Sequence, residues 1–270
     1  MKLADGNDIP PVGLGVAGIP VDLTTSATLA AINAGYRLID TAVIYHNEAE
    51  VGAALAKTNV PRDDLFIATK VWPDRYGYDA VNASFRESMT RLGLDRLDLY
   101  MLHWPAPMLD KYVESWRALI DLQRDGWVTS IGVSNFFPAQ LQRLADETGV
   151  MPVVNQIELH PYSQRLDEQA FHAKNNIATQ CWSPLGRSRC LDDPVINAIA
   201  TKHVRTPAQV VLRWHFEAGR IAIPRSKSPD RIQQNFDIFG FALDADDRSQ
   251  IAALNKGLDG QLGPDPEIAR

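Results

Sequence analysis

Four polar residues stand at or just after the ends of short apolar runs, where buried strands usually give way to turn residues. They are Asp40, Tyr45, Lys70 and His103. A tyrosine can donate a proton to a carbonyl oxygen, although a free tyrosine has a pKa of about 10. Lys70 can lower that pKa, Asp40 can keep Lys70 charged, and His103 can hydrogen-bond the carbonyl oxygen. These residue types predict a site that protonates a carbonyl oxygen, provided that the fold brings them together.

The elements that must position these residues alternate between strand and helix patterns. Most of the strand candidates are continuous apolar runs, as expected for parallel strands buried on both faces. Alternating strands and helices predict an α/β fold, a closed (β/α)8 TIM barrel, in which the carboxyl ends of all strands open onto one catalytic face. The strand candidates are Arg37–Thr41, Leu65–Lys70, Leu97–His103, Ser130–Ser134, Val153–Glu158, Ala178–Ser183, Ile221–Pro224 and Phe236–Phe239.

Helical patterns lie between most of these runs, and several end just before a glycine, a common stop signal. We expect the turn-rich segment before Arg37 to form a β-hairpin that caps the barrel bottom. No linker or low-complexity segment interrupts the chain, so residues 1–270 are expected to form a single barrel domain. The expected helices are Ser26–Ala34, Glu48–Lys57, one from the cap Asp79 to Arg91, Glu114–Arg124, Pro138–Glu147, Pro194–His203, Pro207–Ala218, Asp230–Asn235 after the cap Ser228, and Asp246–Asn255.

Composition excludes several classes of function. The chain has 45% hydrophobic and 22% charged residues, typical of a globular protein with a sizeable core, and its net charge of -6 argues against nucleic acid or an anionic membrane as the main partner. No apolar run approaches the length of a membrane span, and the N-terminus lacks the apolar region of a signal peptide. Cys181 and Cys190 cannot staple a chain of this size, so a reducing cytoplasm is expected. The histidines show no metal-binding spacing, and no metal is expected.

A glycine motif offers a rival fold. Gly13, Gly15 and Gly18 match G-x-G-x-x-G, and Asp40 follows at the distance of a ribose-binding acid, as in a Rossmann dehydrogenase. The context argues against this reading, because prolines precede the motif and Pro20 falls where the helix should run. The alternative is that Gly13 and Gly15 let the backbone turn at the barrel mouth.

Several motifs follow one another in order along the chain. They are Asp40-Thr41-Ala42 with Tyr45, Asn47 and Glu48, then Lys70, Leu102-His103-Trp104-Pro105, Ile131-Gly132-Val133-Ser134-Asn135-Phe136, Asn155-Gln156-Ile157-Glu158-Leu159-His160-Pro161, Ser183-Pro184-Leu185-Gly186 and Ile223-Pro224-Arg225-Ser226. By these motifs the chain resembles the aldo-keto reductase family along essentially its whole length. Within that family, its compact C-terminus and loops resemble the bacterial 2,5-diketo-D-gluconate reductase group. The resemblance implies NADPH-dependent reduction of aldehydes or ketones, keto sugars such as 2,5-diketo-gluconate among them, with Tyr45 as general acid and Asp40, Lys70 and His103 in support.

Residues that could hold the cofactor lie late in the chain. Amide and hydroxyl groups at two strand ends can bond a nicotinamide carboxamide, and Trp182 offers a flat face for stacking against the ring. A phosphate would suit the basic stretch that opens a helix after the seventh strand candidate. The resemblance assigns that stretch to the 2′-phosphate of NADPH. The expected cofactor residues are Ser134, Asn135 and Gln156 at the carboxamide, Trp182 at the ring, Ser183, Leu185 and Gly186 over the pyrophosphate, Arg225, Ser226 and Arg231 at the 2′-phosphate, and Gln234 and Asn235 at the adenine.

The remaining expectations concern substrate and partners. Ala17, Trp72 and Trp104, with His103 and the tail after Gly257, are expected to wall the substrate pocket. The expected partner is a small carbonyl compound, and the chain is expected to be a monomer. A non-catalytic nicotinamide-binding sensor is the second rival, but binding alone does not need an acid–base group. Glu48 and Glu158 have no assigned role beyond helix N-terminal charge and packing.

Overall fold

Eight parallel strands follow one another around a barrel in chain order in the computed structural model, which describes residues 1–264. The last strand returns to the first, because the Ala222 amide donates to the Pro11 carbonyl at 3.0 Å and the Gly15 amide to the Pro224 carbonyl at 3.2 Å. The predicted (β/α)8 barrel is therefore confirmed, and the rival Rossmann fold is wrong. The strands are β1 (Gly13–Gly15), β2 (Leu38–Asp40), β3 (Phe66–Val71), β4 (Leu97–Leu102), β5 (Val128–Ser134), β6 (Val154–Glu158), β7 (Ala178–Trp182) and β8 (Ile221–Ala222).

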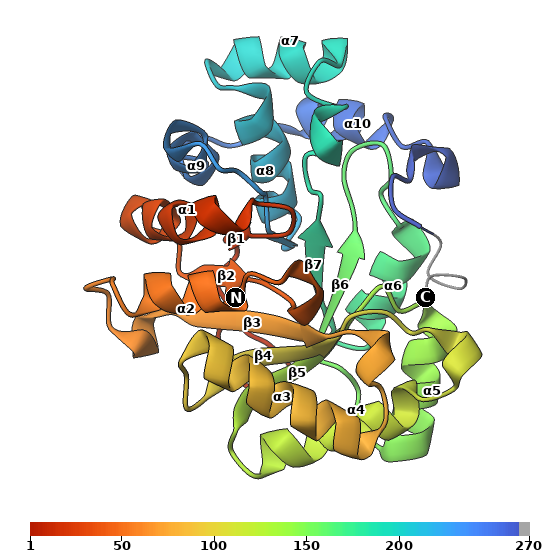
Figure 1. Cartoon of the computed structure of the whole chain (residues 1–270). Coiled ribbons are helices and arrows are strands. Elements are labelled where there is room, and N and C mark those ends of the chain that lie inside the picture. Colours follow the sequence, from red (N-terminus) through yellow and green to blue (C-terminus); the bar gives the residue numbers. More distant parts are fainter. Residues whose placement is uncertain (265–270) are drawn as a thin grey trace.

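Helices surround the barrel (Figure 1). Those within residues 1–264 are α1 (Val21–Ala34), α2 (Glu48–Leu55), α3 (Tyr78–Leu92), α4 (Tyr112–Arg124), α5 (Pro138–Thr148), α6 (Leu166–Lys174), α7 (Pro194–His203), α8 (Pro207–Glu217), α9 (Pro229–Phe236) and α10 (Ala245–Ala252). Helix α6 was not expected from the sequence. It begins after Arg165, which has a φ of 51° and no side-chain cap, so the usual start signal is missing. Among these helices, none is long and apolar enough to cross a membrane.

One expected strand is wrong and another was missed. Phe236–Phe239 is not a strand, because α9 ends at Phe236 and irregular chain follows. Its apolar residues serve helix packing instead, since Ile238 is fully buried and the Phe236 ring lies 4.7 Å from the ring of Tyr36. The true first strand is β1, which lies inside the turn-rich segment. The other seven strand candidates are confirmed, with shifts at their ends.

Gly13 and Gly15 are expected to turn the backbone at the barrel mouth, but both lie in the strand β1. Gly13 is a strand residue, and a Cβ atom built on it would lie 2.5 Å from Cγ of Leu38 on the neighbouring strand. The strand therefore needs glycine there for close packing rather than for conformational freedom. The turn comes later, at Gly18, where φ is 67°.

The N-terminal hairpin is confirmed in a short form. Lys2 and Asp8 form an antiparallel bridge, and the Leu3 amide donates to the Asn7 carbonyl at 2.8 Å. Leu3 and Ile9 are buried in one apolar cluster with residues at the starts of β2, β3 and β4. The hairpin thus closes the amino-terminal end of the barrel and leaves the carboxyl end open.

Candidate active site

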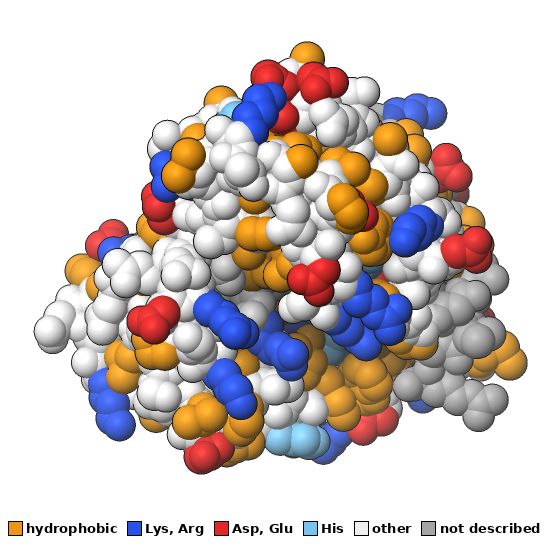
Figure 2. All heavy atoms as spheres, turned by 90° about the horizontal axis from the view of Figure 1, so that it is seen from above, with side chains coloured by type: hydrophobic (Ala, Val, Ile, Leu, Met, Phe, Trp, Pro, Cys, Tyr) orange, Lys and Arg blue, Asp and Glu red, His pale blue; other side chains and the backbone are white. Residues whose placement is uncertain are grey.

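Two adjoining cavities lie at the carboxyl ends of the strands. The first has a volume of about 590 Å³ and the second of about 880 Å³, and they share Gly18, Leu185, Ser188 and Arg225. Arg187 lines the first cavity, and Lys227 and Arg231 line the second. Seen from above, lysine and arginine side chains gather around a hollow in the surface (Figure 2). This basic surface lies on a chain of net charge -6, so the positive charge is local and suits an anionic ligand.

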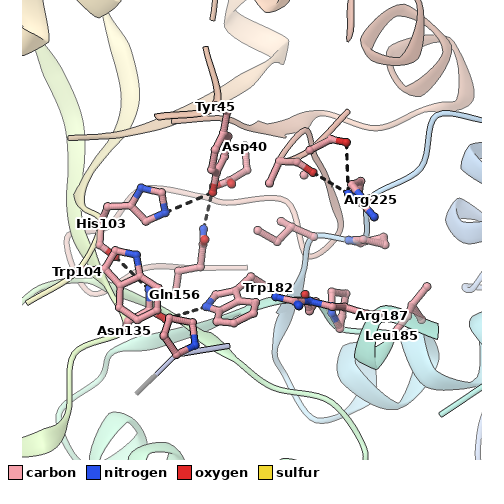
Figure 3. Close-up of a pocket in the computed structure, with 18 of the residues that line it drawn as sticks. Asp40, Tyr45, His103, Trp104, Asn135, Gln156, Trp182, Leu185, Arg187 and Arg225 are labelled. Carbon is pink, nitrogen blue, oxygen red and sulfur yellow. Dashed lines mark hydrogen bonds between the residues drawn. The ribbon is translucent and has the colours of Figure 1, made fainter. Parts of the chain in front are cut away.

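The four residues singled out from the sequence converge on the first cavity. Asp40 ends β2, Tyr45 ends the short helix η1 (Val43–Tyr45), Lys70 lies in β3 and His103 follows β4. The Lys70 Nζ atom lies 2.5 Å from Oδ1 of Asp40, and the Tyr45 hydroxyl lies 3.3 Å from Nε2 of His103. Lys70 Nζ is also 5.3 Å from the centre of the Tyr45 ring. Figure 3 shows Asp40, Tyr45 and His103 facing the same space.

Lys70 lies behind this group rather than in the cavity. Its side chain is fully buried, and its ammonium donates to Asp40 and, at 2.9 Å, to the Thr41 carbonyl. The other Asp40 oxygen accepts from Nε2 of Gln156 at 2.8 Å. Burial raises the pKa of Asp40 and lowers that of Lys70, while their mutual attraction opposes both shifts. The short bond between them therefore holds Lys70 oriented beneath Tyr45.

The pKa of Tyr45 shifts in the direction opposite to the expected one. Burial, and then the Asp40 charge, raise the pKa of Tyr45 well above its ordinary value of 10.0. The Lys70 ammonium, paired with Asp40 at 2.5 Å, does not outweigh the effect of burial. Burial, and then the Lys70 charge, lower the pKa of His103 well below 6.5. The pair is therefore a protonated phenol beside a neutral imidazole, a combination that can donate a proton.

The residues expected at the carboxamide form a network of their own. The Ser134 hydroxyl donates to the Gln156 backbone carbonyl at 2.8 Å, and the side-chain amide of Asn135 donates to the His103 backbone carbonyl at 3.0 Å. The indole of Trp182 donates to Oδ1 of Asn135 at 2.8 Å. These bonds fix Trp182 at one wall of the cavity, opposite Tyr45 and His103 (Figure 3). Hydrogen bonds within the protein thus hold these side chains in place around the cavity.

The basic stretch after β8 lies in the second cavity. Ser228 caps α9 by accepting from the Arg231 amide, and Pro229 is the first helical residue, as the sequence predicts. Arg225 reaches back across the barrel, where its Nη1 atom donates to the Ala17 and Gly18 carbonyls at 3.3 Å each. A helix N-terminus flanked by arginines can hold a phosphate.

The described structure sorts the expected site residues by position. Trp72 contacts the His103 ring edge-on at 5.0 Å between ring centres but lines neither cavity as formed by residues 1–264. Lys70, Ser134 and Gly186 are buried and also line neither of these cavities. The first cavity is lined by Ala17, Asp40, Tyr45, His103, Trp104, Asn135, Gln156, Trp182, Ser183, Leu185 and Arg225 among the expected residues. The second is lined by Leu185, Arg225, Ser226, Arg231, Gln234 and Asn235 among them.

Sequence reasoning missed some residues of the cavity walls. Arg187 and Ser188 extend the loop after β7, with φ values of 49° and 72°, and the basic residue just after Ser183–Gly186 was a usable signal. Pro264 also lines the first cavity, and it was not missed, because it belongs to the tail after Gly257 that is expected to wall the pocket. The rest of that tail, residues 265–270, lies outside the described residues.

Comparison with known proteins agrees with this geometry. Residues 17–256 match the Aldo/keto reductase family. An aldo-keto reductase of Mycolicibacterium smegmatis is 52% identical over 266 residues, 98% of this chain and 96% of that protein. Methylglyoxal reductase DkgA of Escherichia coli K12 is 46% identical over 269 residues, 99% of this chain and 96% of that protein. The crystal structure of a Gox0644 mutant in complex with NADPH has a TM-score of 0.96 and 47% identity, and covers 100% of this chain and 98% of that one. The chain belongs to the aldo/keto reductase family.

Proposed function

We propose that this enzyme reduces small aldehydes and ketones with NADPH, and that Tyr45 is the general acid. The observation that carries the proposal is the Tyr45 hydroxyl, 3.3 Å from His103 and facing a cavity whose opposite wall is Trp182. The similarity to a protein crystallised with NADPH supports the choice of cofactor. The basic walls of the second cavity and the α9 N-terminus fit a phosphorylated dinucleotide.

The residues around the first cavity divide the work of a carbonyl reduction. NADPH, when bound, supplies the hydride that a carbonyl carbon accepts. Tyr45 gives its proton to the oxygen on which charge develops, and its raised pKa ensures that it carries a proton to give. His103 hydrogen-bonds the same oxygen, and Lys70, 5.3 Å from the Tyr45 ring centre, stabilises the phenolate left behind. Asp40 keeps Lys70 charged in a buried place.

Trp182 and its partners would hold the nicotinamide end of the cofactor. We assign the ring to the face of Trp182, which the Asn135 bond fixes, and the carboxamide to the free bonding capacity of Asn135 and Gln156. Ser183, Leu185 and Gly186 would cover the pyrophosphate, because they belong to the loop after β7, of which Leu185 and Ser188 line both cavities. Arg225, Ser226 and Arg231 would hold the 2′-phosphate, with Gln234 and Asn235 beside the adenine.

The substrate we propose is a small carbonyl compound such as methylglyoxal, or a keto sugar such as 2,5-diketo-gluconate. The DkgA relatives, named as methylglyoxal reductases, support the first. Ala17 leaves room at the cavity wall, while Trp104, exposed to 8%, forms another part of that wall, and Trp72 packs edge-on against the His103 ring. A screen of aldehydes and ketones for NADPH oxidation, followed by absorbance, tests this. No oxidation with any carbonyl would contradict the proposal.

Tyr45→Phe tests the role of the acid. We predict a loss in kcat of at least about 10²-fold, because general acid catalysis commonly contributes that much, with the Kd for NADPH nearly unchanged. Tyr78→Phe is the matched control, since the hydroxyl of Tyr78, at the start of α3, donates to Asp121 of α4 in an exposed hydrogen bond, and the variant loses a surface contact. If Tyr45→Phe kept more than roughly a tenth of the wild-type kcat, Tyr45 would not be the acid.

We also propose that the protein is a monomer that acts in a reducing cytoplasm. Cys181 and Cys190 are both free and buried, and burial raises the pKa of each thiol to about 12. Such thiols are poor nucleophiles and do not depend on an oxidising compartment. Light scattering behind a sizing column would give the mass of one chain. A mass of two or more chains at micromolar concentration would contradict the monomer.

A further inference from the structure

The chain after α10 returns to the barrel mouth and is fastened there by one carboxylate. The Leu262 amide donates to Oε1 of Glu158 at 2.6 Å, and the Gly263 amide donates to Oε2 at 2.7 Å. Two consecutive backbone amides thus take the two oxygens of a single side chain. Bonds from amides to a charged acceptor are stronger than those to a neutral one. Glu158 ends β6, so a residue of the rigid barrel holds the tail.

The surroundings of Glu158 suit it for this contact. The residue is 4% exposed, and Nε2 of His160 lies 3.0 Å from Oε1. Within residues 1–264, His160 is the one basic side chain in ion-pair range of this carboxylate. Burial alone would raise the pKa of Glu158, but the hydrogen bonds from His160, Gly263 and Leu262 together hold it below its ordinary value. The carboxylate is therefore charged at neutral pH, and it accepts hydrogen bonds from His160 and from the tail.

The tail that this contact holds forms part of the first cavity. A Cβ atom on Gly263 would lie 2.5 Å from Cη2 of Trp182, so the tail backbone is pressed against the indole. The next residue, Pro264, lines the cavity together with Trp182. Gln261 adds a second fastening, because its Oε1 atom accepts from Arg165 at 3.3 Å. Movement of the tail would uncover the edge of Trp182 and remove one wall.

We propose that Glu158 is a positioning residue whose carboxylate seats residues 261–264 against Trp182 and thereby sets the shape of the substrate cavity. It touches neither substrate nor cofactor and acts through the tail. The part of this inference that concerns substrate rests on the proposed function. The part that concerns the tail does not, because the contacts are those of the protein alone.

Two kinds of variant break the contact from opposite sides. Glu158→Gln keeps the shape of the side chain but presents an NH2 group to one of the two amides, so at most one bond survives. Leu262→Pro removes one donor from the tail. Gln261 has φ -64° and ψ 142°, which a residue before proline readily adopts. Leu262→Ala keeps the amide and is the matched control.

The first measurement is hydrogen exchange of the Leu262 and Gly263 amides in the protein without cofactor or substrate. We expect both to be protected in the wild type and in Leu262→Ala. Loss of one bond to a charged group should speed exchange by about 10–100-fold in Glu158→Gln. In Leu262→Pro, the remaining Gly263 amide should lose protection to a similar degree. Rapid exchange of both amides in the wild type, or unchanged protection in Glu158→Gln, would overturn the inference.

The second measurement is steady-state kinetics with a carbonyl substrate that the wild type reduces. We expect both contact-breaking variants to raise KM while leaving kcat within about threefold, since the catalytic group is untouched. The double variant should be no worse than either single one, because both remove the same contact. Additive effects on KM, or a fall in kcat with unchanged KM, would show that Glu158 does not act through the tail. A wild type that reduces no carbonyl would refute the proposed function but leave the exchange result standing. Far-UV circular dichroism checks folding, and Leu262→Pro, which changes only the tail, keeps the test open if Glu158→Gln does not fold.

Discussion

Tyr45 and His103 face each other, and both side chains are uncharged at neutral pH. This predicts how the rate of reduction depends on pH. The pKa of His103 is lowered well below 6.5, so the imidazole becomes charged only in acid, and the pKa of Tyr45 is raised above 10.0, so the phenol ionises only in strong base. We predict that kcat/KM for reduction does not change between pH 6.5 and pH 10.0, the ordinary pKa values of the two groups. The check is a pH profile of kcat/KM, which reports the free enzyme. An inflection inside that range, lost in Tyr45→Phe, would mean that one of the two groups titrates there.

Asp40 forms a buried ion pair with Lys70. The barrel interpretation and the Rossmann interpretation predict different outcomes for the substitution of Asp40. In Asp40→Asn the ammonium of Lys70 loses its partner, and burial, which lowers the pKa of Lys70, then favours the neutral amine. We predict a large fall in kcat with little change in the Kd for NADPH, measured by fluorescence titration. A large rise in Kd with an unchanged kcat would instead mark Asp40 as a cofactor contact. Circular dichroism is needed as a control, because breaking a buried pair can cost about 3–5 kcal/mol of stability.

The sequence shows which residues have the right chemistry better than it shows their environment. Asp40, Lys70 and His103 stand out because each closes an apolar run, and such strand ends meet in a barrel. The direction of the Tyr45 pKa shift does not follow from the sequence, because it depends on burial and on the nearby Asp40 charge. The tail partners of Glu158, Leu262 and Gly263, lie 104 and 105 residues away, and no local pattern encodes them.

At the scale of elements, strands that contain apolar runs were predictable, even short ones such as β2 and β8, and the glycine-rich β1 was not. The strand candidates that became β3 and β4 contain several large apolar residues, whereas β1 is three residues with two glycines, which have low strand propensity. Phe236–Phe239 has a strand composition, but its residues pack against α1 and α8 as the end of a helix and irregular chain. Tertiary packing, which the sequence does not show locally, decided both cases.

The basic residues at the N-terminus of α9 should make the protein bind NADPH more tightly than NADH. A charge-assisted bond contributes about 1.5–3 kcal/mol, or roughly 10–100-fold in affinity, and NADH lacks the 2′-phosphate that would accept it. We predict that Arg225→Gly and Arg231→His each raise the Kd for NADPH by about that factor, barely affect NADH, and flatten the salt dependence of NADPH binding. Arg117→Gly, an exposed position on α4, is the control.

The two arginines also differ in a way that the same titrations can reveal. Arg225 holds the Ala17 and Gly18 carbonyls, so its loss can loosen the loop after β1 as well as remove a charge. Arg231 has no such contact with that loop among the hydrogen bonds of residues 1–264, so its effect should be confined to the phosphate. Equal losses for NADPH and NADH in both variants would show that neither arginine reads the 2′-phosphate.

At the scale of the whole molecule, the first and last thirds of the chain are joined in one structure. The Tyr36 hydroxyl at the end of α1 donates to the Ile232 carbonyl in α9 at 3.1 Å, and the Tyr36 and Phe236 rings pack 4.7 Å apart. The Ala222 amide of β8 donates to Pro11 just before β1. A closed ring of strands has no edge at which one part could unfold and leave the rest paired. These contacts favour the single domain expected from the sequence.

We therefore predict that urea unfolds the chain in one transition, with far-UV circular dichroism and tryptophan fluorescence giving the same midpoint. Gly13→Ala sharpens the test, because its Cβ would meet Leu38 at 2.5 Å inside the barrel. Such overpacking costs about 1–3 kcal/mol and should lower both midpoints together. Gly240→Ala is the control, since its Cβ would lie 3.4 Å from the end of the flexible Arg205 side chain. Two separated transitions, or a Gly13→Ala variant that shifts one probe and not the other, would show that the barrel consists of parts that unfold independently.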